Sequence, residues 1–324
     1  EAMNDFKPDV IHVNNFQRQL SASIIKAAND KSVPVVFTAH DLQAICPAIT
    51  MQDAHGNICE LCTGGKYLNC FKKRCIKNST AKSLLGAIEG YYYKNKKIYK
   101  DKISCIITPS EFVRKKFLND GISPNKVVVL HNYVETKDYN IGNKEGDYAF
   151  FFGRLSQEKG INNLIQAFSK LEKGKLYIAG DGPEKENIEE YIKQNNLSER
   201  IKMIGYQNKD EIIKYISECR FVVVPSTCNE NCPYSIIETM AVGKPIIASN
   251  NGGIPELVIN EETGFTYKCE DVNELSEKMN ILFSDNNIVD EFSRKAKELS
   301  KYYDKEEYYK EIIKIYRKVI KGEK

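Results

Sequence analysis

Short apolar runs alternate along the chain with polar or glycine turns and longer amphipathic stretches. In the first half the runs lie at 10–13, 35–38, 103–108 and 127–130, and in the second half at 148–152, 175–179, 201–204, 221–224 and 245–248. This alternation predicts buried strands that are joined by helices and form parallel sheets covered on both faces. The expected fold class is α/β.

A polar stretch at 132–147, in which Gly142, Asn143 and Gly146 are grouped, predicts a connection between two domains. We therefore expect a first domain at residues 1–140 and a second at 141–300. In the tail, 301–324, apolar residues recur at helical spacing, which predicts a terminal amphipathic helix.

Length and charge narrow the classes of function. The chain has 324 residues, of which 42% are hydrophobic, so it can bury two cores and is not expected to be a single small binding module. Its net charge of +3 is too small to indicate nucleic-acid binding. No run of about twenty apolar residues occurs, and no secretion signal is visible, so we expect a cytoplasmic location.

The interval 46–102 breaks the alternation of strands and helices, and we interpret it as an insertion into the first domain. Half of the ten cysteines fall within it. Cys59 and Cys62 form a C-x2-C pair that, together with Cys70 and Cys75, fits a structural zinc site. Reduced thiols and disulfides are the alternatives.

Downstream of the cysteines the sequence predicts a helix from Ser79 onward, with an apolar stripe formed by Leu84, Leu85, Ile88 and Tyr92. The surrounding segment is rich in lysine and tyrosine. This composition suits the headgroup layer of an anionic membrane, here the inner face, or a diphosphate-linked lipid acceptor, although a solvated helix face explains the lysines equally well.

The most informative segment runs from Pro225 to Ala241 and reads PSTCNENCPYSIIETMA. It begins where the buried strand at 221–224 ends and becomes a helix near Tyr234. Open parallel sheets bind ligands at the carboxyl ends of their strands, and a helix N-terminus there offers N–H groups and a positive dipole end to a phosphate. Glu230 and Glu238 can then meet a sugar and a ribose. Two solvated surface glutamates are the alternative.

The stretch from Glu230 to Glu238, followed by Gly243-Lys-Pro, resembles the E-x7-E signature of family 4 glycosyltransferases. Further segments stand in that family's order, at 152–160, 179–183, 204–206, 252–256 and 263–265. The resemblance implies a GT-B fold, in which two Rossmann-like domains face a central cleft and the C-terminal helix returns to the first domain. The second domain would bind the nucleotide sugar.

The same resemblance implies a retaining, metal-independent hexosyltransferase. It would move a sugar from a UDP- or GDP-linked donor to a carbohydrate or lipid-linked acceptor, in cell-surface polysaccharide or glycolipid assembly. No cofactor is expected for catalysis.

The resemblance also assigns roles to residues of this chain. Arg154 and Lys159 would bind the donor diphosphate and stabilise the negative charge that develops as it leaves. Glu230 would hold the donor sugar, and His40 would face that sugar, although a lone histidine after a strand is more often structural. The other predicted donor-site residues are Gly153, Gly205, Tyr206, Cys232, Pro233, Tyr234, Ser235 and Glu238, and Ser110 and Asn132 also match family positions.

Family members begin with a strand and a glycine-rich loop ahead of the segment that resembles Pro8 to Val13, and neither is visible in this sequence. We therefore expect an N-terminal piece to be missing, and the alternative function is a catalytically incompetent donor-binding fragment. Sugar-nucleotide epimerases and phosphorylases are less favoured, because the chain shows neither the acid and base pair of the former nor the cofactor lysine of the latter.

Overall fold

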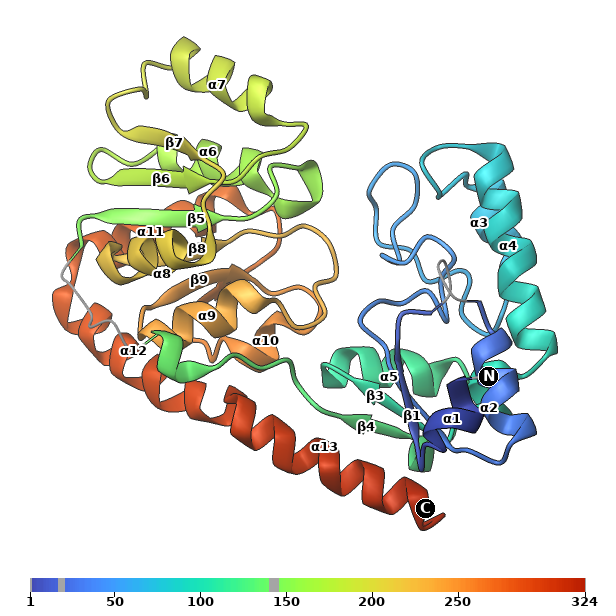
Figure 1. Cartoon of the computed structure of the whole chain (residues 1–324). Helices are drawn as coiled ribbons and strands as arrows, with labels where there is room; N and C mark the ends of the chain where they lie inside the picture. The colour runs from blue at the N-terminus through green and yellow to red at the C-terminus, as the bar shows by residue number, and fades with distance from the viewer. Residues whose placement is uncertain (1, 17–20, 140–145, 324) are drawn as a thin grey trace. The chain divides into compact units, whose positions relative to one another are not determined.

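The computed structural model describes residues 2–16, 21–139 and 146–323 (Figure 1). The chain forms two compact units. The first comprises Glu1–His131 and Tyr308–Lys324, and the second comprises Asn132–Glu307. The chain thus changes unit at His131–Asn132, ahead of the polar stretch in which we placed the boundary, and again within its last helix.

The first unit contains a four-stranded parallel sheet in the order β1-β2-β3-β4. Each strand coincides with an apolar run of the sequence. The strands are β1 (Ile11–Asn14), β2 (Val35–Thr38), β3 (Cys105–Thr108) and β4 (Val127–Val129), and the helices outside the insertion are α1 (Ala2–Phe6), α2 (Ser23–Asp30), α5 (Glu111–Asn119) and the 3-10 turn η2 (Pro124–Lys126).

Alternating residues of these strands face two different layers, as the two-residue period of a strand requires. Val35 and Phe37 of β2 belong to a core that α2 and α5 complete. Val36, between them, belongs to a smaller cluster on the other face, where it joins Ile312 of the terminal helix α13 (Lys305–Ile320). The C-terminal helix therefore returns to the first unit and covers one face of its sheet, as expected.

The insertion folds as two helices, α3 (Leu68–Lys72) and α4 (Thr80–Asn95), followed by the π-helical turn η1 (Ile98–Lys102). The Ser79 side chain accepts a hydrogen bond from the Lys82 N–H at 3.4 Å and so caps α4. This confirms the helix expected from Ser79. A small apolar cluster of Cys62, Tyr67, Cys70 and Ala87 joins the two helices.

The second unit contains a six-stranded parallel sheet in the order β10-β9-β8-β5-β6-β7. Its strands are β5 (Tyr148–Phe152), β6 (Lys175–Ala179), β7 (Ile201–Gly205), β8 (Phe221–Val224), β9 (Ile246–Ser249) and β10 (Gly264–Tyr267). The helices and 3-10 turns are η3 (Thr136–Tyr139), η4 (Gln157–Lys159), α6 (Ile161–Ser169), α7 (Lys185–Gln194), α8 (Lys209–Glu218), α9 (Tyr234–Val242), α10 (Ile254–Leu257), α11 (Val272–Ser284), α12 (Asn286–Leu299) and η5 (Ser300–Tyr303).

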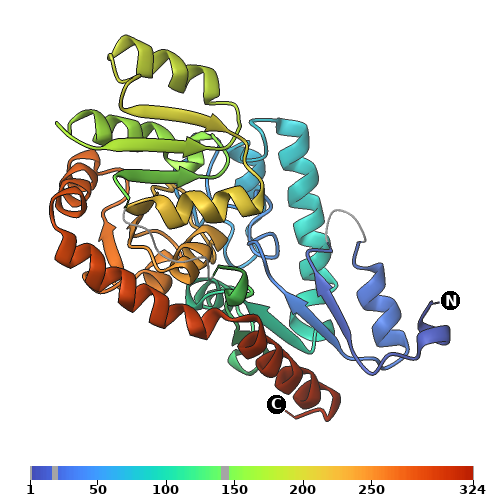
Figure 2. The ribbon, with the colours of Figure 1, turned by 60° about the vertical axis from the view of Figure 1, so that its left-hand side comes forward.

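Helices cover both faces of this sheet, with α6 and α11 on one side and α8 and α9 on the other (Figures 1 and 2). Along β5, Ala149 and Phe151 face the first of these layers, whereas Phe150 faces the second. Burial on both faces explains why these strands read as continuous apolar runs. Because all six strands are parallel, their carboxyl ends lie along one edge of the sheet.

His12 links the terminal helix to the first sheet. Its Nδ1 lies 2.6 Å from the hydroxyl oxygen of Tyr316 on α13, and its Nε2 lies 2.7 Å from Oγ1 of Thr38 on β2. A neutral imidazole can donate at one nitrogen and accept at the other, whereas an imidazolium can only donate. Burial, together with the nearby His40, lowers the pKa of His12 from its ordinary value of 6.5.

This lowered pKa predicts a pH-dependent stability of the first unit. The unfolded chain binds the His12 proton more readily than the folded chain, so the free energy of unfolding should fall as the pH is lowered from about 7 to about 5. His12→Gln should reduce that dependence, measured by thermal unfolding at several pH values. The exposed His55 provides the control His55→Gln, and an equal pH dependence in His12→Gln and the unsubstituted protein would contradict the assignment.

Candidate functional site

Backbone hydrogen bonds continue the second sheet beyond the carboxyl ends of its strands. The Gly153 N–H donates to the Ala179 carbonyl at 3.1 Å, and the Gly180 N–H donates to the Gly205 carbonyl at 2.8 Å. Gly153, Gly180 and Gly205 follow or end β5, β6 and β7, which are neighbours in the sheet. One glycine therefore stands at the carboxyl end of each of three adjacent strands.

Two features make glycine necessary in this row. All three residues have positive φ, of 154° at Gly153, 137° at Gly180 and 70° at Gly205, which L side chains rarely adopt. In addition, a Cβ on Gly180 would lie 1.8 Å from the Gly153 carbonyl oxygen. The row thus presents bare backbone where the other strand ends carry side chains.

A cavity of about 360 Å³ is lined by two glycines of this row, Gly153 and Gly180. Its lining includes three of the residues predicted from the sequence, Gly153, Arg154 and Tyr206, together with Asp181 and Gln207. Tyr206 is 80% exposed, so its ring is accessible at the rim. The predicted residues Lys159, Glu230 and Glu238 lie outside the lining of this cavity.

Lys159 and Glu230 meet beyond the carboxyl ends of β5 and β8, which are neighbours in the sheet. Lys159, at the end of η4 after β5, places its Nζ 2.6 Å from Oε1 of Glu230, in the loop after β8. The Ser226 hydroxyl donates to the same oxygen at 2.7 Å. Burial acts to lower the pKa of Lys159, but the Glu230 carboxylate outweighs it and the pKa is raised. Lys159 is therefore a fixed cation next to a fixed carboxylate.

Close backbone contacts hold the loop that carries Glu230. The Gly253 N–H donates to the Glu230 carbonyl at 2.7 Å, and a Cβ on Gly252 would lie 2.1 Å from that carbonyl oxygen. On the other side, a Cβ on Gly160 would lie 1.8 Å from the Pro225 carbonyl oxygen. The glycines that follow β9 thus position Glu230.

Asn229 is a residue that the sequence analysis missed. Its side-chain nitrogen is buried and has no hydrogen-bond partner within the described chain. Such an atom costs about 1–3 kcal/mol and calls for an explanation, such as a ligand or a water. Only its place beside Glu230 could have pointed to it.

The start of α9 is where the sequence predicts a phosphate site. The helix begins at Tyr234, directly after Pro233, and no side chain caps its first N–H groups within the described structure. Cys232, which precedes Pro233, is buried. It is held by Asn132, whose Nδ2 donates to the Cys232 carbonyl at 2.7 Å. Asn132 therefore anchors the loop just ahead of the helix N-terminus. Ser235 lies in the first turn.

Glu238, on α9, has a partner that the sequence did not reveal. The Tyr139 hydroxyl donates to Oε1 of Glu238 at 3.1 Å. Burial raises the pKa of Glu238, while the Tyr139 hydrogen bond and Lys209 act against that rise. Lys209 also lies over the Tyr139 ring, with its Nζ 5.4 Å from the ring centre.

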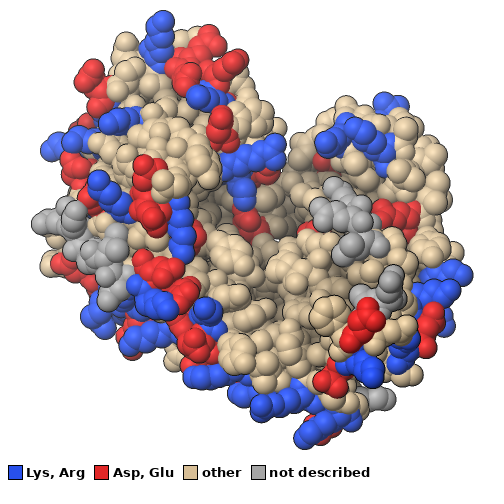
Figure 3. Space-filling view, in the orientation of Figure 1, with Lys and Arg blue, Asp and Glu red and all other residues tan. Residues whose placement is uncertain are grey.

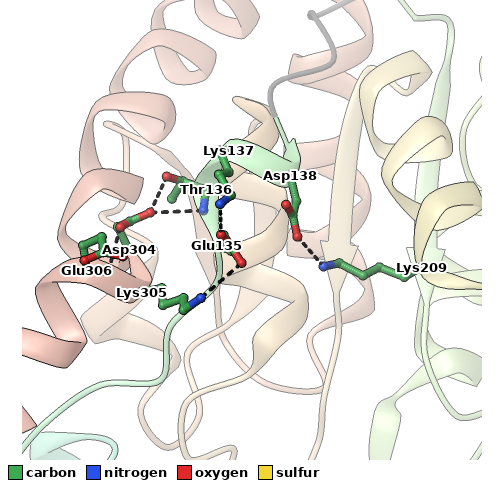
Figure 4. A network of polar contacts seen from close by, with 8 residues as sticks. All are labelled: Glu135, Thr136, Lys137, Asp138, Lys209, Asp304, Lys305 and Glu306. Carbon is green, nitrogen blue, oxygen red and sulfur yellow. Dashed lines mark hydrogen bonds and ion pairs between the residues drawn. The ribbon is translucent and has the colours of Figure 1, made fainter.

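Tyr139 lies at the end of the segment that connects the first unit to the second, and polar contacts tie this segment down (Figure 4). Lys209 pairs with Asp138 at 2.9 Å. The Thr136 N–H donates to Asp304 at 3.1 Å, and Lys305 pairs with Glu135 at 3.5 Å. Residues just after the chain enters the second unit are thus bound to residues just before it returns to the first unit.

In the first unit, His40 lies just after β2, as expected. Its Nε2 is 2.8 Å from Oδ1 of Asn14, at the end of β1. Burial lowers the pKa of His40, and the neighbouring Asp41 acts against that shift. Ser110, which also matched a family position, is buried and caps α5 by accepting from the Val113 N–H at 3.3 Å. This contact gives Ser110 a structural role.

The cysteines of the insertion do not form the predicted zinc site. Cys59, Cys62, Cys70 and Cys75 carry free thiols. Cys62 and Cys70 are packed as small apolar side chains, and burial raises the pKa of the Cys62 thiol to about 12. Across residues 2–16, 21–139 and 146–323, no group of three or more His, Cys, Asp or Glu side chains could hold a metal ion.

Comparison with known proteins matches both halves of the chain to glycosyltransferases. The profile described as "Glycosyl transferases group 1" matches residues 135–299, and "Glycosyltransferase Family 4" matches residues 1–138. The chain belongs to the group 1 glycosyltransferases. An uncharacterized glycosyltransferase of Methanocaldococcus jannaschii is 31% identical over 75% of this chain and 67% of its own length.

A second relative of this glycosyltransferase carries a specific name. It is the N-acetylgalactosamine-N,N'-diacetylbacillosaminyl-diphospho-undecaprenol 4-alpha-N-acetylgalactosaminyltransferase of Campylobacter jejuni, 27% identical over 60% of this chain and 55% of that protein. The chain thus spans little more than half of this relative's length.

Solved structures confirm the GT-B fold. HepE of Anabaena, determined with UDP, superposes with a TM-score of 0.73 over 94% of this chain and 78% of its own, at 20% identity. Sucrose-phosphate synthase of Thermosynechococcus elongatus superposes with a TM-score of 0.75 over 99% of this chain and 76% of its own, at 19% identity. Among the described helices of this glycosyltransferase, none has the length and apolar character needed to cross a membrane.

The glycine row predicts unequal effects of adding one methyl group. Gly180→Ala should destabilise the second unit by more than Gly205→Ala, because both residues have positive φ but a Cβ on Gly205 meets no atom within 4 Å. Strain from positive φ alone costs about 1–2 kcal/mol, and Gly180→Ala must also displace the Gly153 backbone. Denaturant unfolding of the two variants measures the difference, and equal losses would show that the close approach is not maintained.

Proposed function

We propose that this protein is a retaining, metal-independent hexosyltransferase that uses a nucleotide-diphosphate sugar. The observation that carries the proposal is the carboxyl edge of the second sheet. There a glycine-floored cavity lined by Arg154 and Tyr206 adjoins strand ends that carry the Lys159–Glu230 pair. The uncapped start of α9 follows the same loop.

The donor would bind along this edge. The base would occupy the cavity over the glycine row, beside Gly205 and Tyr206, where bare backbone leaves room for a flat ring. Arg154, Lys159 and the first N–H groups of α9, with Gly153, Pro233, Tyr234 and Ser235 around them, would hold the diphosphate. Glu238 would accept from the ribose hydroxyls, and Glu230 would hold the sugar.

The proposed retaining reaction would use the charges available at this site. The acceptor hydroxyl would attack the anomeric carbon from the face that the diphosphate leaves, so that the bond from carbon to phosphate oxygen breaks as the bond to the acceptor oxygen forms. The acceptor proton would pass to the leaving phosphate oxygen. Lys159 and Arg154 would stabilise the developing negative charge, which is the role a divalent cation would otherwise fill. We also propose that His40 contacts the donor sugar.

Relatives and neighbours guide the choice of substrate. HepE binds UDP and UDP-glucose, and the Campylobacter relative is named for a diphospho-undecaprenol acceptor. We therefore propose a UDP-sugar donor ahead of a GDP-sugar donor, and a lipid-linked or other carbohydrate acceptor in polysaccharide or glycolipid assembly. Contact with an anionic membrane at the inner face is a separate proposal, which does not depend on the choice of substrate. Nothing in the comparisons favours the alternative of an inactive donor-binding fragment.

Calorimetric titration with UDP, GDP and ADP, alongside assays of donor hydrolysis and sugar transfer, tests the proposal. Arg154→Ala and Lys159→Ala should each weaken UDP binding by about tenfold and lower turnover by about a hundredfold or more, because each removes a charge-assisted contact to the leaving group. Lys193→Ala, at an exposed position on α7, is the control.

The outcomes of this experiment are distinct. UDP binding with turnover, and an unchanged anomeric configuration in the product, would support the proposal. UDP binding without turnover would point to the donor-binding fragment. Failure to bind any of the three nucleotides would overturn the assignment of the site.

Tyr139 offers a second test, because its hydroxyl supports the charged form of Glu238. Tyr139→Phe removes a hydrogen bond that acts against the raised pKa, so the pKa of Glu238 should rise further. UDP affinity should then begin to fall at a higher pH in the variant than in the unsubstituted protein, since a protonated Glu238 accepts less well from ribose. Tyr302→Phe, at an exposed site, is the control. Superimposable pH profiles would exclude Glu238 from the nucleotide site.

A further inference from the structure

Helix α4 of the insertion turns its large apolar side chains toward solvent. Leu84 is 41% exposed, Leu85 67%, Ile88 56% and Tyr92 53%. These four residues recur at helical spacing and share one face. Monomeric proteins rarely leave a contiguous apolar face of this kind uncovered, and such faces often mark interaction sites.

The opposite face of α4 fixes this orientation. It carries the fully buried small residues Ser83 and Ala87, with the buried ring of Tyr93 near its C-terminal end. A Cβ on Gly86 would lie 2.5 Å from the Ile76 side chain, and a Cβ on Gly90 would lie 2.8 Å from the Tyr67 ring. Rotating the helix to bury its leucines would drive bulky side chains into these contacts. The outward position of the apolar stripe is therefore built into the packing of the insertion.

Positive charge is concentrated around the same helix. Residues 72–102 contain ten Lys and Arg against two Asp and Glu, a net charge of +8, whereas the whole chain carries only +3. Lys82 and Lys96 are exposed, and they lie one helical turn from Leu85 and Tyr92 respectively. Figure 3 shows this part of the first unit largely in the tan of uncharged residues, with Lys and Arg gathered at its upper end.

We propose that this face of α4 docks onto an anionic lipid bilayer. Leu84, Leu85 and Ile88 would insert between the headgroups, Tyr92 would sit at their level, and Lys82 and Lys96 would meet lipid phosphates. The positive charge of the segment distinguishes between two possible partners of this face, a second copy of the chain and an anionic membrane. A second copy of this chain would bring two segments of net charge +8 together, whereas an anionic membrane complements them. This surface belongs to one unit and the proposed nucleotide site to the other, so the docking proposal does not rest on the transferase proposal.

The absence of tryptophan from the sequence allows a direct test. Leu85→Trp introduces a sole tryptophan on the proposed docking face, and Tyr302→Trp introduces one at a site that is 78% exposed on the second unit. On addition of vesicles of equimolar phosphatidylglycerol and phosphatidylcholine, the emission of the first variant should shift to shorter wavelength. The second variant should not shift. No shift in Leu85→Trp would overturn the proposal.

Sedimentation with the same vesicles separates the two components of binding. Leu85→Ser with Ile88→Ser should lower the vesicle-bound partition coefficient by about tenfold, because apolar insertion is lost while the charge is unchanged. Lys82→Gln with Lys96→Gln should lower it by a smaller factor that vanishes at high salt. The matched controls are Tyr302→Ser with Ile320→Ser, at exposed apolar positions elsewhere, and Lys193→Gln.

Two results would contradict this assignment. One is undiminished vesicle binding by the Leu85→Ser, Ile88→Ser variant. The other is a concentration-dependent dimer that this variant abolishes, which would assign the face to a second copy of the chain. UDP titration of the same variants should be unchanged, so a failure of membrane docking is distinguishable from a failure of the donor site.

Discussion

The candidate site depends on how closely the backbone approaches itself at the carboxyl ends of β5 and β6. The carbonyl oxygen of Gly153 occupies the space that any Cβ on Gly180 would need. Because the strands are parallel, this contact lies on the same edge as the loops after β7, β8 and β9. The glycine row therefore does two things: it leaves an open floor under the cavity, and it sets the path of the chain toward Arg154 and Lys159. A displaced Gly153 would move both cations away from the strand edge.

The charged groups at this edge are held before any ligand arrives. Glu230 is fixed through its carbonyl by the Gly253 N–H, and through its carboxylate by Ser226 and Lys159. Fixed groups need little reorganisation when a charged ligand binds, which is the basis of electrostatic preorganisation. The same pairing has a cost, because a diphosphate must share Lys159 with Glu230. A sugar hydroxyl that donates to Glu230 would compensate, so sugar and diphosphate should each favour the binding of the other.

The sequence predicted local elements well and long-range contacts poorly. The nine apolar runs all became strands, within about two residues at each end, because burial on both faces leaves a clear signature. The short strand β10 was not predicted, since Gly264–Tyr267 carries only a glycine motif and no apolar run. The pairing of Tyr139 with Glu238 spans 99 residues, and that of His12 with Tyr316 spans 304, so no local pattern could reveal either.

In α4 the helical period of the apolar residues predicted which residues share a face but not which face is buried. Gly86 and Gly90 were the available signal, because glycines on one side of a helix permit close packing there.

Every residue proposed to bind the nucleotide lies in the unit that comprises Asn132–Glu307, whereas His40 lies in the other. Nucleotide affinity should therefore depend on the second unit, and turnover on both. Asn132 and Tyr139 stand on the segment where the chain leaves the first unit. Asn132 holds Cys232, in the loop just ahead of α9, and Tyr139 holds Glu238, within that helix. A shift of that segment would act first on Glu238, which we propose binds the ribose, and on the turn before the proposed phosphate site. The connection between the units thus contains residues that contact the proposed donor site, so nucleotide binding at that site would act directly on the segment that joins the units.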